Sequence, residues 1–228
     1  MIGEKQALLL DMNSTFMFGE DRFGEDEDFA IFYRTIGGEL GDSEINQLIR
    51  NVYQDLSDKY PRVEYRHCFP TLESCIRCHG DPHLMTKEVE NIVQTFAFHE
   101  CGEIPDEYAS VLFALDKRFI LSVVIDIWAP KELWLQKFKR LDIHRLFKAS
   151  SYSSDHGMVK PSPKPFELVV QQLGLSKSAC VVIGDSVRRD LGGATAAGID
   201  CILVDGAQDA GALASFPNLL AFCHELRL

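Results

Sequence analysis

Short, continuous apolar runs separated by longer amphipathic segments dominate the hydrophobic pattern of the chain. Four such runs stand out: Ala7–Leu10, Ile120–Ile125, Ala179–Ile183 and Cys201–Val204. A continuous run, rather than an alternating one, is typical of a strand in a parallel sheet whose two faces are both covered. The pattern therefore predicts four buried parallel strands.

Amphipathic helical patterns lie between the later runs. Pro130–Leu141 follows the second run, Pro163–Leu173 precedes the third, and Val187–Gly198 precedes the fourth. Alternation of strand and helix favours a doubly wound α/β sheet. Ligands bind such sheets at the carboxyl ends of the strands, so the residues directly after each apolar run are the first candidates for chemistry.

The stretch from Gly19 to Ile104 breaks this alternation. Two sets of apolar residues there fall on single helix faces: Ile45, Leu48, Ile49, Val52 and Leu56, and then Val89, Ile92, Val93 and Phe96. No apolar run with strand character lies among them. We therefore expect an α/β core of residues 1–18 and 105–228 and a smaller helical insert of residues 19–104.

Composition narrows the class of protein. The chain has 228 residues, of which 46% are hydrophobic and 25% charged, as in a folded globular protein. Its formal net charge of −11, without a basic patch, disfavours nucleic acid and membrane as partners. Ala7–Leu10 is too short for a signal core. With seven cysteines, an odd number, we expect reduced thiols in a cytoplasmic protein.

Asp11 directly follows the first apolar run and is followed by a polar turn. A carboxylate at a strand end can act as a nucleophile, with backbone N–H groups beside it. A residue of this type in this place is also a common turn former. Asp11 alone therefore leaves both interpretations open.

A second acidic group follows the third run. Asp185 stands between Gly184 and Ser186, and Asp190 comes five residues later. Glycine permits a tight turn, Asp185 can ligate a hard cation, and Asp190 can support the metal site from one helical turn away. The alternative is a helix N-cap formed by Asp185 or Ser186.

A lysine completes the set. Lys160 precedes a predicted helix and is followed by Pro161-Ser162-Pro163, which holds it rigidly. It can neutralise a phosphate or balance two carboxylates. In isolation it could equally be a solvated lysine in a stiff loop.

The order and spacing of these pieces resemble the haloacid dehalogenase-like hydrolase superfamily. The matching segments are Asp11–Thr15 as the first motif, Gly157–Pro163 as the third, and Val182–Asp190 as the fourth, with Gly193-Ala194 and Ala197-Gly198 beyond it. The resemblance covers about Ala7–Phe18 and Asp106–Asp205. It is most specific in the fourth motif.

The resemblance implies a function and a role for each residue. Asp11 would attack phosphorus and carry a transient aspartyl-phosphate. Mg²⁺ would be held by Asp11, the backbone carbonyl of Asn13, Asp185 and the substrate phosphate, with Asp190 in support. Lys160 would neutralise charge near the nucleophile, and the helical insert would be a mobile cap. The expected activity is Mg²⁺-dependent hydrolysis of a small phosphorylated metabolite.

The first motif departs from the family pattern. Phosphatases of the family carry a second aspartate two residues after the nucleophile, where this chain has Asn13. An amide cannot usefully exchange a proton. General acid–base catalysis contributes about 10²–10⁴-fold, so we expect a weakened or specialised enzyme that favours acyl phosphates or anhydrides.

The second motif also departs. The family places Ser or Thr at the end of the second core strand to hold a phosphoryl oxygen, and here Ile125 or Asp126 takes that place. We favour Ile125; the hydroxyl is missing in either register. Asp126 and Ser186 remain the candidate substrate- or phosphate-binding residues. The alternative role for Asp126 is to cap the helix that begins near Pro130.

Two other functions remain open. The chain could be a catalytically silent member that binds a phosphometabolite or a protein partner. A dehalogenase-like activity is less favoured, because dehalogenases of the family lack the second aspartate but also usually lack the metal-binding acid that Asp185 supplies.

A cluster of cysteine and histidine lies in the predicted insert: His67, Cys68, Cys75, Cys78, His79 and His83. Two cysteines two residues apart with nearby histidines could hold zinc, although a full set of four ligands at finger-like spacing is not evident. Cys75–His79 also matches the c-type haem attachment pattern, which the absence of an export signal disfavours. The plain alternative is buried thiols in a polar loop.

Overall fold

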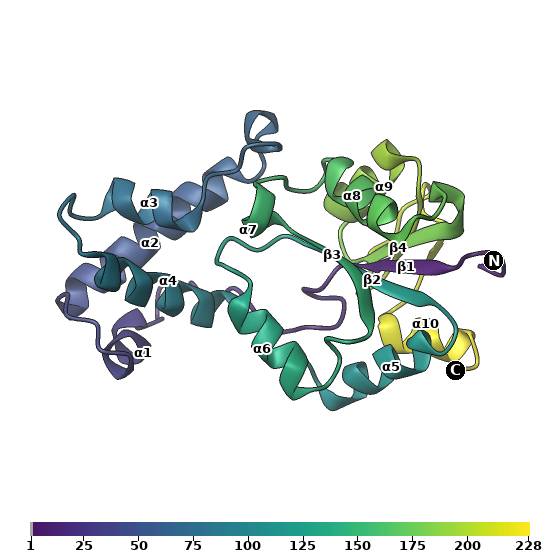
Figure 1. The fold of residues 1–228 in the computed structure, drawn as a ribbon, viewed down its shortest axis with the longest axis horizontal. Helices are drawn as coiled ribbons and strands as arrows, with labels where there is room; N and C mark the ends of the chain where they lie inside the picture. Colours follow the sequence, from purple (N-terminus) through teal and green to yellow (C-terminus); the bar gives the residue numbers. More distant parts are fainter. Residues whose placement is uncertain (1) are drawn as a thin grey trace.

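A single parallel sheet organises the carboxyl-terminal half of the chain and its first strand. The computed structural model describes residues 2–228 and contains six strands in the order β3-β2-β1-β4-β5-β6 (Figure 1). Their bounds are β1 Ala7–Leu10, β2 Ile120–Ile125, β3 Phe147–Tyr152, β4 Cys180–Gly184, β5 Asp200–Leu203 and β6 Ala214–Ser215. Every neighbouring pair is parallel. The predicted parallel α/β sheet is confirmed.

Four of the six strands were predicted, and two were not. The ranges of β1 and β2 match their apolar runs, and β4 and β5 begin within one residue of theirs. β3 escaped prediction because Phe147–Tyr152 contains Lys148, Ser150 and Ser151. As an edge strand it is only partly buried, so it needs no continuous apolar run. β6 is only two residues long.

Helices cover both faces of the sheet. Along β1, Leu8 and Leu10 face the apolar layer that includes α5 (Asp106–Asp116) and α10 (Leu219–Glu225). Ala7 and Leu9 face the opposite layer, formed with α8 (Lys164–Leu173) and α9 (Gly192–Ala197). Side chains alternate between faces along a strand, so a strand covered on both sides must be apolar throughout. This explains the continuous run in β1.

The core helices follow the predicted ranges with one irregularity. α6 spans Glu132–Arg140, inside the predicted segment. The helix predicted over Val187–Gly198 begins as a π-helical turn, Val187–Leu191, and continues as α9. A side chain on Gly193 would meet the Phe166 ring at 2.5 Å, so glycine at this position permits the close packing of α9 on α8.

Between β1 and α5 the described chain forms helices and no strand. These are α1 (Phe29–Thr35), α2 (Asp42–Lys59), α3 (Leu72–His79) and α4 (Thr86–Glu100), with a 3₁₀ turn at Val63–Tyr65. We call α1 to α4 the helical insert. Figure 1 shows it at the end of the molecule away from the sheet. The predicted apolar faces of α2 and α4 are buried, except that Val93 is only partly buried. Within residues 2–228, no helix has the length and apolar character needed to cross a membrane.

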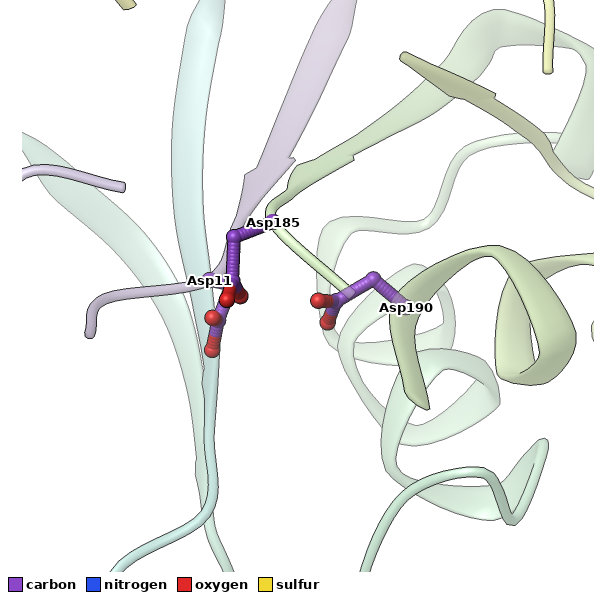
Figure 2. A group of neighbouring side chains, drawn as sticks. All are labelled: Asp11, Asp185 and Asp190. Carbon is purple, nitrogen blue, oxygen red and sulfur yellow. The ribbon is translucent and has the colours of Figure 1, made fainter. Parts of the chain in front are cut away.

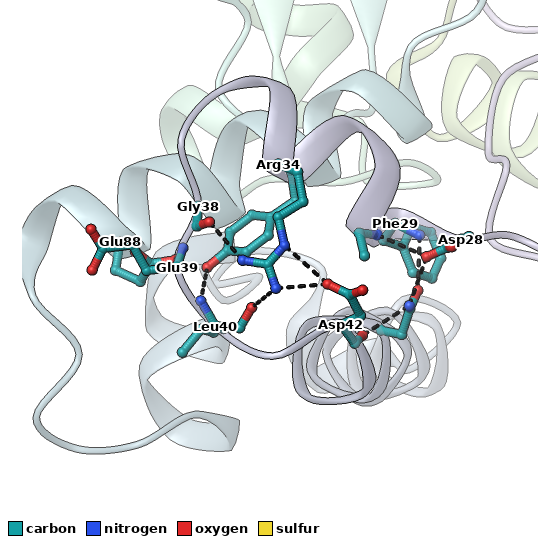
Figure 3. Close-up of polar contacts among 11 residues, drawn as sticks. Asp28, Phe29, Arg34, Gly38, Glu39, Leu40, Asp42 and Glu88 are labelled. Carbon is teal, nitrogen blue, oxygen red and sulfur yellow. Dashed lines mark hydrogen bonds and ion pairs between the residues drawn. The ribbon is translucent and has the colours of Figure 1, made fainter.

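Arg34 holds the turn between α1 and α2 together (Figure 3). Its guanidinium donates to the Gly38 carbonyl at 2.8 Å and to Oδ1 of Asp42 at 2.6 Å. The backbone N–H of Leu40 donates to the Tyr33 hydroxyl at 3.1 Å. These hydrogen bonds pair the backbone groups of the turn and hold α1 and α2 together.

Within residues 2–228, backbone hydrogen bonds join the insert to the core at two places. At its base, Phe18 and Glu103 exchange two backbone hydrogen bonds of 2.9 and 2.8 Å, so the chain enters and leaves the insert side by side. At its far side, segment 60–69 lies against the loop before α8. There the Phe69 N–H donates to the Gly157 carbonyl, and the Val159 N–H donates to the Arg66 carbonyl. Segment 60–69 therefore lies close to the carboxyl ends of the strands.

Candidate active site

Two neighbouring strands deliver two of the acidic side chains. Asp11 follows β1, and its N–H donates to the Ile183 carbonyl at 2.8 Å, which extends the pairing of β1 with β4. Asp185 follows β4, so the two residues leave the sheet side by side. Asp190 reaches the same point from the π-helical turn. One carboxylate oxygen from each of the three lies within 4.8 Å of the others (Figure 2).

Lys160 lies inside this carboxylate group. Its side chain is 3% exposed, and Nζ lies 2.5 Å from Oδ1 of Asp11 and 2.7 Å from Oδ1 of Asp190. Burial alone would lower the pKa of Lys160, but the carboxylates of Asp11, Asp190 and Asp126 raise it well above the usual value. Lys160 is therefore a permanent positive charge beside the predicted nucleophile.

The carboxylates remain in excess over this one ammonium. Burial raises the pKa of Asp11, and the charge of Asp185 adds to the effect, while Lys160 opposes it. Burial and the charge of Asp190 raise the pKa of Asp185, whose Oδ1 is buried without a hydrogen-bond partner. A group of hard oxygen donors with unbalanced negative charge fits a divalent cation such as Mg²⁺.

Asp190 is held in place by its neighbours. Its Oδ2 accepts a hydrogen bond from the Ser186 N–H at 3.0 Å, and its Oδ1 accepts from Lys160. A side chain on Gly184 would meet Cγ of Asp190 at 2.3 Å, so only glycine allows the carboxylate to approach β4. The Ser186 hydroxyl accepts from the Arg189 N–H at 3.2 Å and caps the turn. A phosphate-binding role for Ser186 stays a prediction.

The second-motif position is occupied by Asp126, and the register that we favoured from the sequence is wrong. Ile125 is 1% exposed and belongs to the apolar core. Asp126 instead turns toward Lys160, whose backbone N–H donates to its Oδ2 at 2.8 Å. The sequence could not settle this, because both residues stand at the strand end and only side-chain direction separates them. Burial raises the pKa of Asp126.

Asn13 lies in the turn after Asp11. It pairs with Met17 in an isolated bridge, and Ser14 adopts a left-handed conformation with φ 54°. The side-chain oxygen of Asn13 is buried without a hydrogen-bond partner. The roles of the Asn13 side chain and of its backbone carbonyl at a metal stay predictions.

Three side chains beyond the predicted site residues lie near the site. The Tyr60 hydroxyl donates to Oδ2 of Asp126 at 2.5 Å. The Ser14 hydroxyl lies 3.4 Å from Oε1 of Glu20, whose pKa is raised by burial. Arg189 approaches Oδ2 of Asp185 at 3.9 Å. The sequence around Tyr60 and Glu20 does not indicate a functional role, because both residues lie outside the motifs. Arg189 could have been found from its place directly before Asp190.

The cysteine and histidine cluster does not form a metal site. Across residues 2–228, the carboxylates of Asp11, Asp185 and Asp190 make the single group of three or more potential ligands. Cys75 is buried, Cys68 and Cys78 are exposed, and all are free thiols. His79 lies 3.3 Å from Oδ2 of Asp55. These residues therefore form no group of zinc ligands, and the plain interpretation of buried thiols in a loop holds only in part, because Cys68 and Cys78 are exposed and Cys75 and Cys78 lie in α3.

Solved structures share this fold. A 2-haloacid dehalogenase from Pseudomonas syringae pv. tomato superposes with a TM-score of 0.65 at 20% identity, covering 98% of each chain. A HAD phosphatase from Thermococcus onnurineus gives 0.63 at 19% identity, covering 97% of each chain. At this level of identity the likeness concerns the fold alone.

Sequence relatives point in the same direction. A protein named glyceraldehyde 3-phosphate phosphatase from Methanopyrus kandleri is 28% identical over 161 residues, 71% of this chain and 66% of that protein. Another of the same name from Methanothermobacter thermautotrophicus is 30% identical over 101 residues, 44% of each. The family model "haloacid dehalogenase-like hydrolase" matches residues 6–198. The chain therefore belongs to the haloacid dehalogenase-like hydrolase family.

Proposed function

We propose that this protein is a Mg²⁺-dependent phosphatase of a small phosphorylated metabolite, with Asp11 as the nucleophile. The observation that carries the proposal is the convergence of Asp11, Asp185 and Asp190 around the buried ammonium of Lys160. Phosphoryl transfer relies mainly on positioning and electrostatic stabilisation, and this group of charges supplies both.

The contacts of Asp11 separate the roles of its two oxygens. Oδ1 is held by Lys160 at 2.5 Å, which leaves Oδ2 to attack phosphorus. A bond forms between Oδ2 and phosphorus as the bond to the leaving oxygen breaks, which gives an aspartyl-phosphate. Water then attacks phosphorus, releases inorganic phosphate and restores the Asp11 carboxylate. When bound, Mg²⁺ would be held by Asp11, Asp185 and the carbonyl of Asn13, and would offset the charge of the phosphoryl group.

Asn13 limits the range of leaving groups. An alkoxide needs a proton as it departs, and an amide cannot provide one. The leaving group of an acyl phosphate is a carboxylate, and that of a phosphate anhydride is a phosphate. Neither needs a proton as it departs. We therefore infer that this enzyme is specialised toward activated phosphates or is slow on alkyl phosphates.

The helical insert is proposed to act as the cap of this site. Segment 60–69 brings Tyr60 onto Asp126, and Arg188 donates to the Pro61 carbonyl at 2.6 Å. These contacts can break and re-form as the insert moves, which would admit substrate and then exclude water.

The names of the relatives suggest the first natural substrate to assay. Two relatives are named glyceraldehyde 3-phosphate phosphatase, although the alignments cover 66% and 44% of their lengths. Glyceraldehyde 3-phosphate is an alkyl phosphate. Its turnover would show that another group replaces the missing acid.

A second candidate is a catalytically silent binding protein. The amide of Asn13 and the carboxylate of Asp126 both occupy positions where active phosphatases of the family carry other groups. The buried negative charge of Asp126 would repel a phosphate unless that carboxyl is protonated. This observation favours a ligand other than a free phosphate monoester.

The deciding experiment measures phosphate release from acetyl phosphate, p-nitrophenyl phosphate and glyceraldehyde 3-phosphate, with Mg²⁺ and with a chelator. Asp11→Asn, which keeps the shape of the side chain, serves as the blank. We expect Mg²⁺-dependent turnover of acetyl phosphate that disappears in the blank. No release above the blank from any of the three compounds would favour the binding protein.

A further inference from the structure

A cavity of about 950 Å³ lies between the helical insert and the core. Its walls come from α4, from the start of α3, from the loop after β2, and from α7 (Ser153–His156). None of Asp11, Asp126, Lys160 or Asp185 lines it. The cavity is therefore distinct from the carboxylate site.

The Tyr60 ring separates the two spaces. Its centroid lies 5.8 Å from the ring of Phe69 and 5.8 Å from the ring of Trp128, both of which line the cavity. Its hydroxyl faces the other way and donates to Asp126. The three aromatic residues form a wall with the carboxylates on one side and the cavity on the other.

The charges of the lining disfavour an anion. No Lys, Arg or His lines the cavity, but Glu73, Glu90 and Glu132 do. Glu73 pairs with Arg77 at 2.9 Å, and Glu90 lies 3.9 Å from Lys87. Among the described residues, Glu132 has no ion-pair partner. A phosphorylated or carboxylated molecule would meet uncompensated negative charge here.

Most of the remaining lining is apolar, although Thr71, Thr86, Gln94, Gln136 and Ser153 also belong to it. Phe98, Val89, Val93 and Leu133 add to the surface of Phe69 and Trp128. Oγ of Ser154 is buried without a hydrogen-bond partner and lies in the same lining. A buried hydroxyl without a partner is unfavourable, and an oxygen of a ligand would satisfy it once the Ser154 side chain turns toward the cavity.

We propose that this cavity binds an uncharged apolar molecule that carries a hydrogen-bonding oxygen, at a site separate from the phosphatase centre. Its volume falls within the range of about 300–1,000 Å³ that small-molecule sites occupy. The lining supplies apolar contact area, Ser154 supplies the polar contact, and the acidic side chains exclude anions. Binding here does not depend on phosphatase activity.

Trp128 provides a direct reporter of occupancy. The chain has two tryptophans, and Trp134 is fully buried away from the cavity lining. We would titrate the protein with 1-octanol and with octanoate, which share a chain length and differ in charge, and follow tryptophan emission. The expected result is a saturable change with 1-octanol and binding of octanoate that is weaker by about tenfold or more. Trp128→Phe should remove the signal.

Variants locate the bound molecule. Val93→Phe should reduce 1-octanol affinity by filling the cavity, and Ala97→Leu provides a second filling variant should the first fold poorly. Val63→Phe makes the same substitution at a position that is 65% exposed and outside the cavity, so it should leave the affinity unchanged. Ser154→Ala should weaken binding about two- to tenfold, the usual worth of one hydrogen bond.

Three outcomes would overturn the proposal. One is the absence of any saturable change with 1-octanol. Another is binding of octanoate as tight as that of 1-octanol. The third is an affinity for 1-octanol that is the same in the wild type and in both folded filling variants. Thermal unfolding of each variant establishes which of them are folded.

Discussion

Nζ of Lys160 lies 2.5 Å from Oδ1 of Asp11, although 149 positions separate the two residues in the chain. The same ammonium reaches Oδ1 of Asp190 at 2.7 Å. The ion pair therefore joins the loop after β1 to the loop before α8 and to the turn after β4. Its geometry depends on the whole core being folded.

Removing Lys160 should destabilise the core. Lys160→Met leaves the Asp11 and Asp190 carboxylates buried without their partner, and breaking a buried pair in this way costs about 3–5 kcal/mol. Urea unfolding measures the loss. Lys177→Met, at the exposed pair with Glu167, should cost less than about 1 kcal/mol. Equal losses of unfolding free energy in the two variants would show that the buried ion pair stabilises the protein no more than the exposed one.

Restoring the missing acid should raise activity on alkyl phosphates. Asn13→Asp supplies a group that can protonate the leaving oxygen, so glyceraldehyde 3-phosphate hydrolysis should increase by about 10²–10⁴-fold. The measurement is kcat/KM in the presence of Mg²⁺. Asn51→Asp makes the same change on the exposed side of α2 and should have no effect. An unchanged rate for Asn13→Asp would mean that another group already supplies the proton.

Replacing Asp126 should favour phosphate binding. Asp126→Ser removes a buried negative charge from beside Lys160 and introduces a hydroxyl where the family carries one. We expect KM for acetyl phosphate to fall by about tenfold, which corresponds to about 1.4 kcal/mol. The exposed Asp26→Ser provides the control. A higher KM in Asp126→Ser would indicate that the carboxyl itself contacts the substrate.

The metal prediction can be tested without turnover. Asp185 carries a partly buried carboxylate whose pKa is raised by burial and by Asp190, so in metal-free protein its charge is unfavourable. Asp185→Asn should therefore stabilise the metal-free protein by roughly 1 kcal/mol. Added Mg²⁺ should raise the melting temperature of the wild type and not that of the variant. The exposed Asp209→Asn should respond to Mg²⁺ as the wild type does, and an Asp185→Asn protein that also responds would argue against Asp185 as a ligand.

Stability should fall with rising pH because of Glu100. Its carboxylate accepts the N–H groups of Trp128 at 2.6 Å and Ala129 at 2.8 Å, where α4 meets the loop after β2. Burial, with a further effect of Asp21, raises the pKa of Glu100 from 4.5 to about 8. A raised acid pKa means that the folded state holds the proton more tightly, so the contribution of Glu100 to stability is greatest below pH 4.5 and is lost as the pH rises toward 8.

Glu100→Gln should flatten this pH dependence. A tenfold difference in proton affinity between the folded and unfolded states corresponds to about 1.4 kcal/mol, so the contribution amounts to a few kcal/mol. Melting temperatures measured between pH 5 and 8 should fall in the wild type and change less in Glu100→Gln. Glu107→Gln, on the exposed surface of α5, should follow the wild type. Parallel curves for all three proteins would assign the pH dependence to other groups.

The sequence predicted the parts of the site that depend on buried strands. Asp11 and Asp185 could be placed because β1 and β4 are covered on both faces and must therefore be continuously apolar up to the residue where they end. The sequence could not show which of Ile125 and Asp126 faces the site. The hydrophobic pattern locates the end of a strand but not the direction of its last side chain. Tyr60 was missed because its contact depends on how the insert packs.

The paired backbone hydrogen bonds of Phe18 and Glu103 have a consequence for how such a protein can change over time. The chain leaves the core and returns to it at neighbouring points. The segment between them is therefore an insertion whose two ends lie side by side. Its length and sequence can be exchanged without shifting the register of β1 against β2, since loop closure costs little extra as a loop grows. The insert can therefore diverge at a different rate from the core.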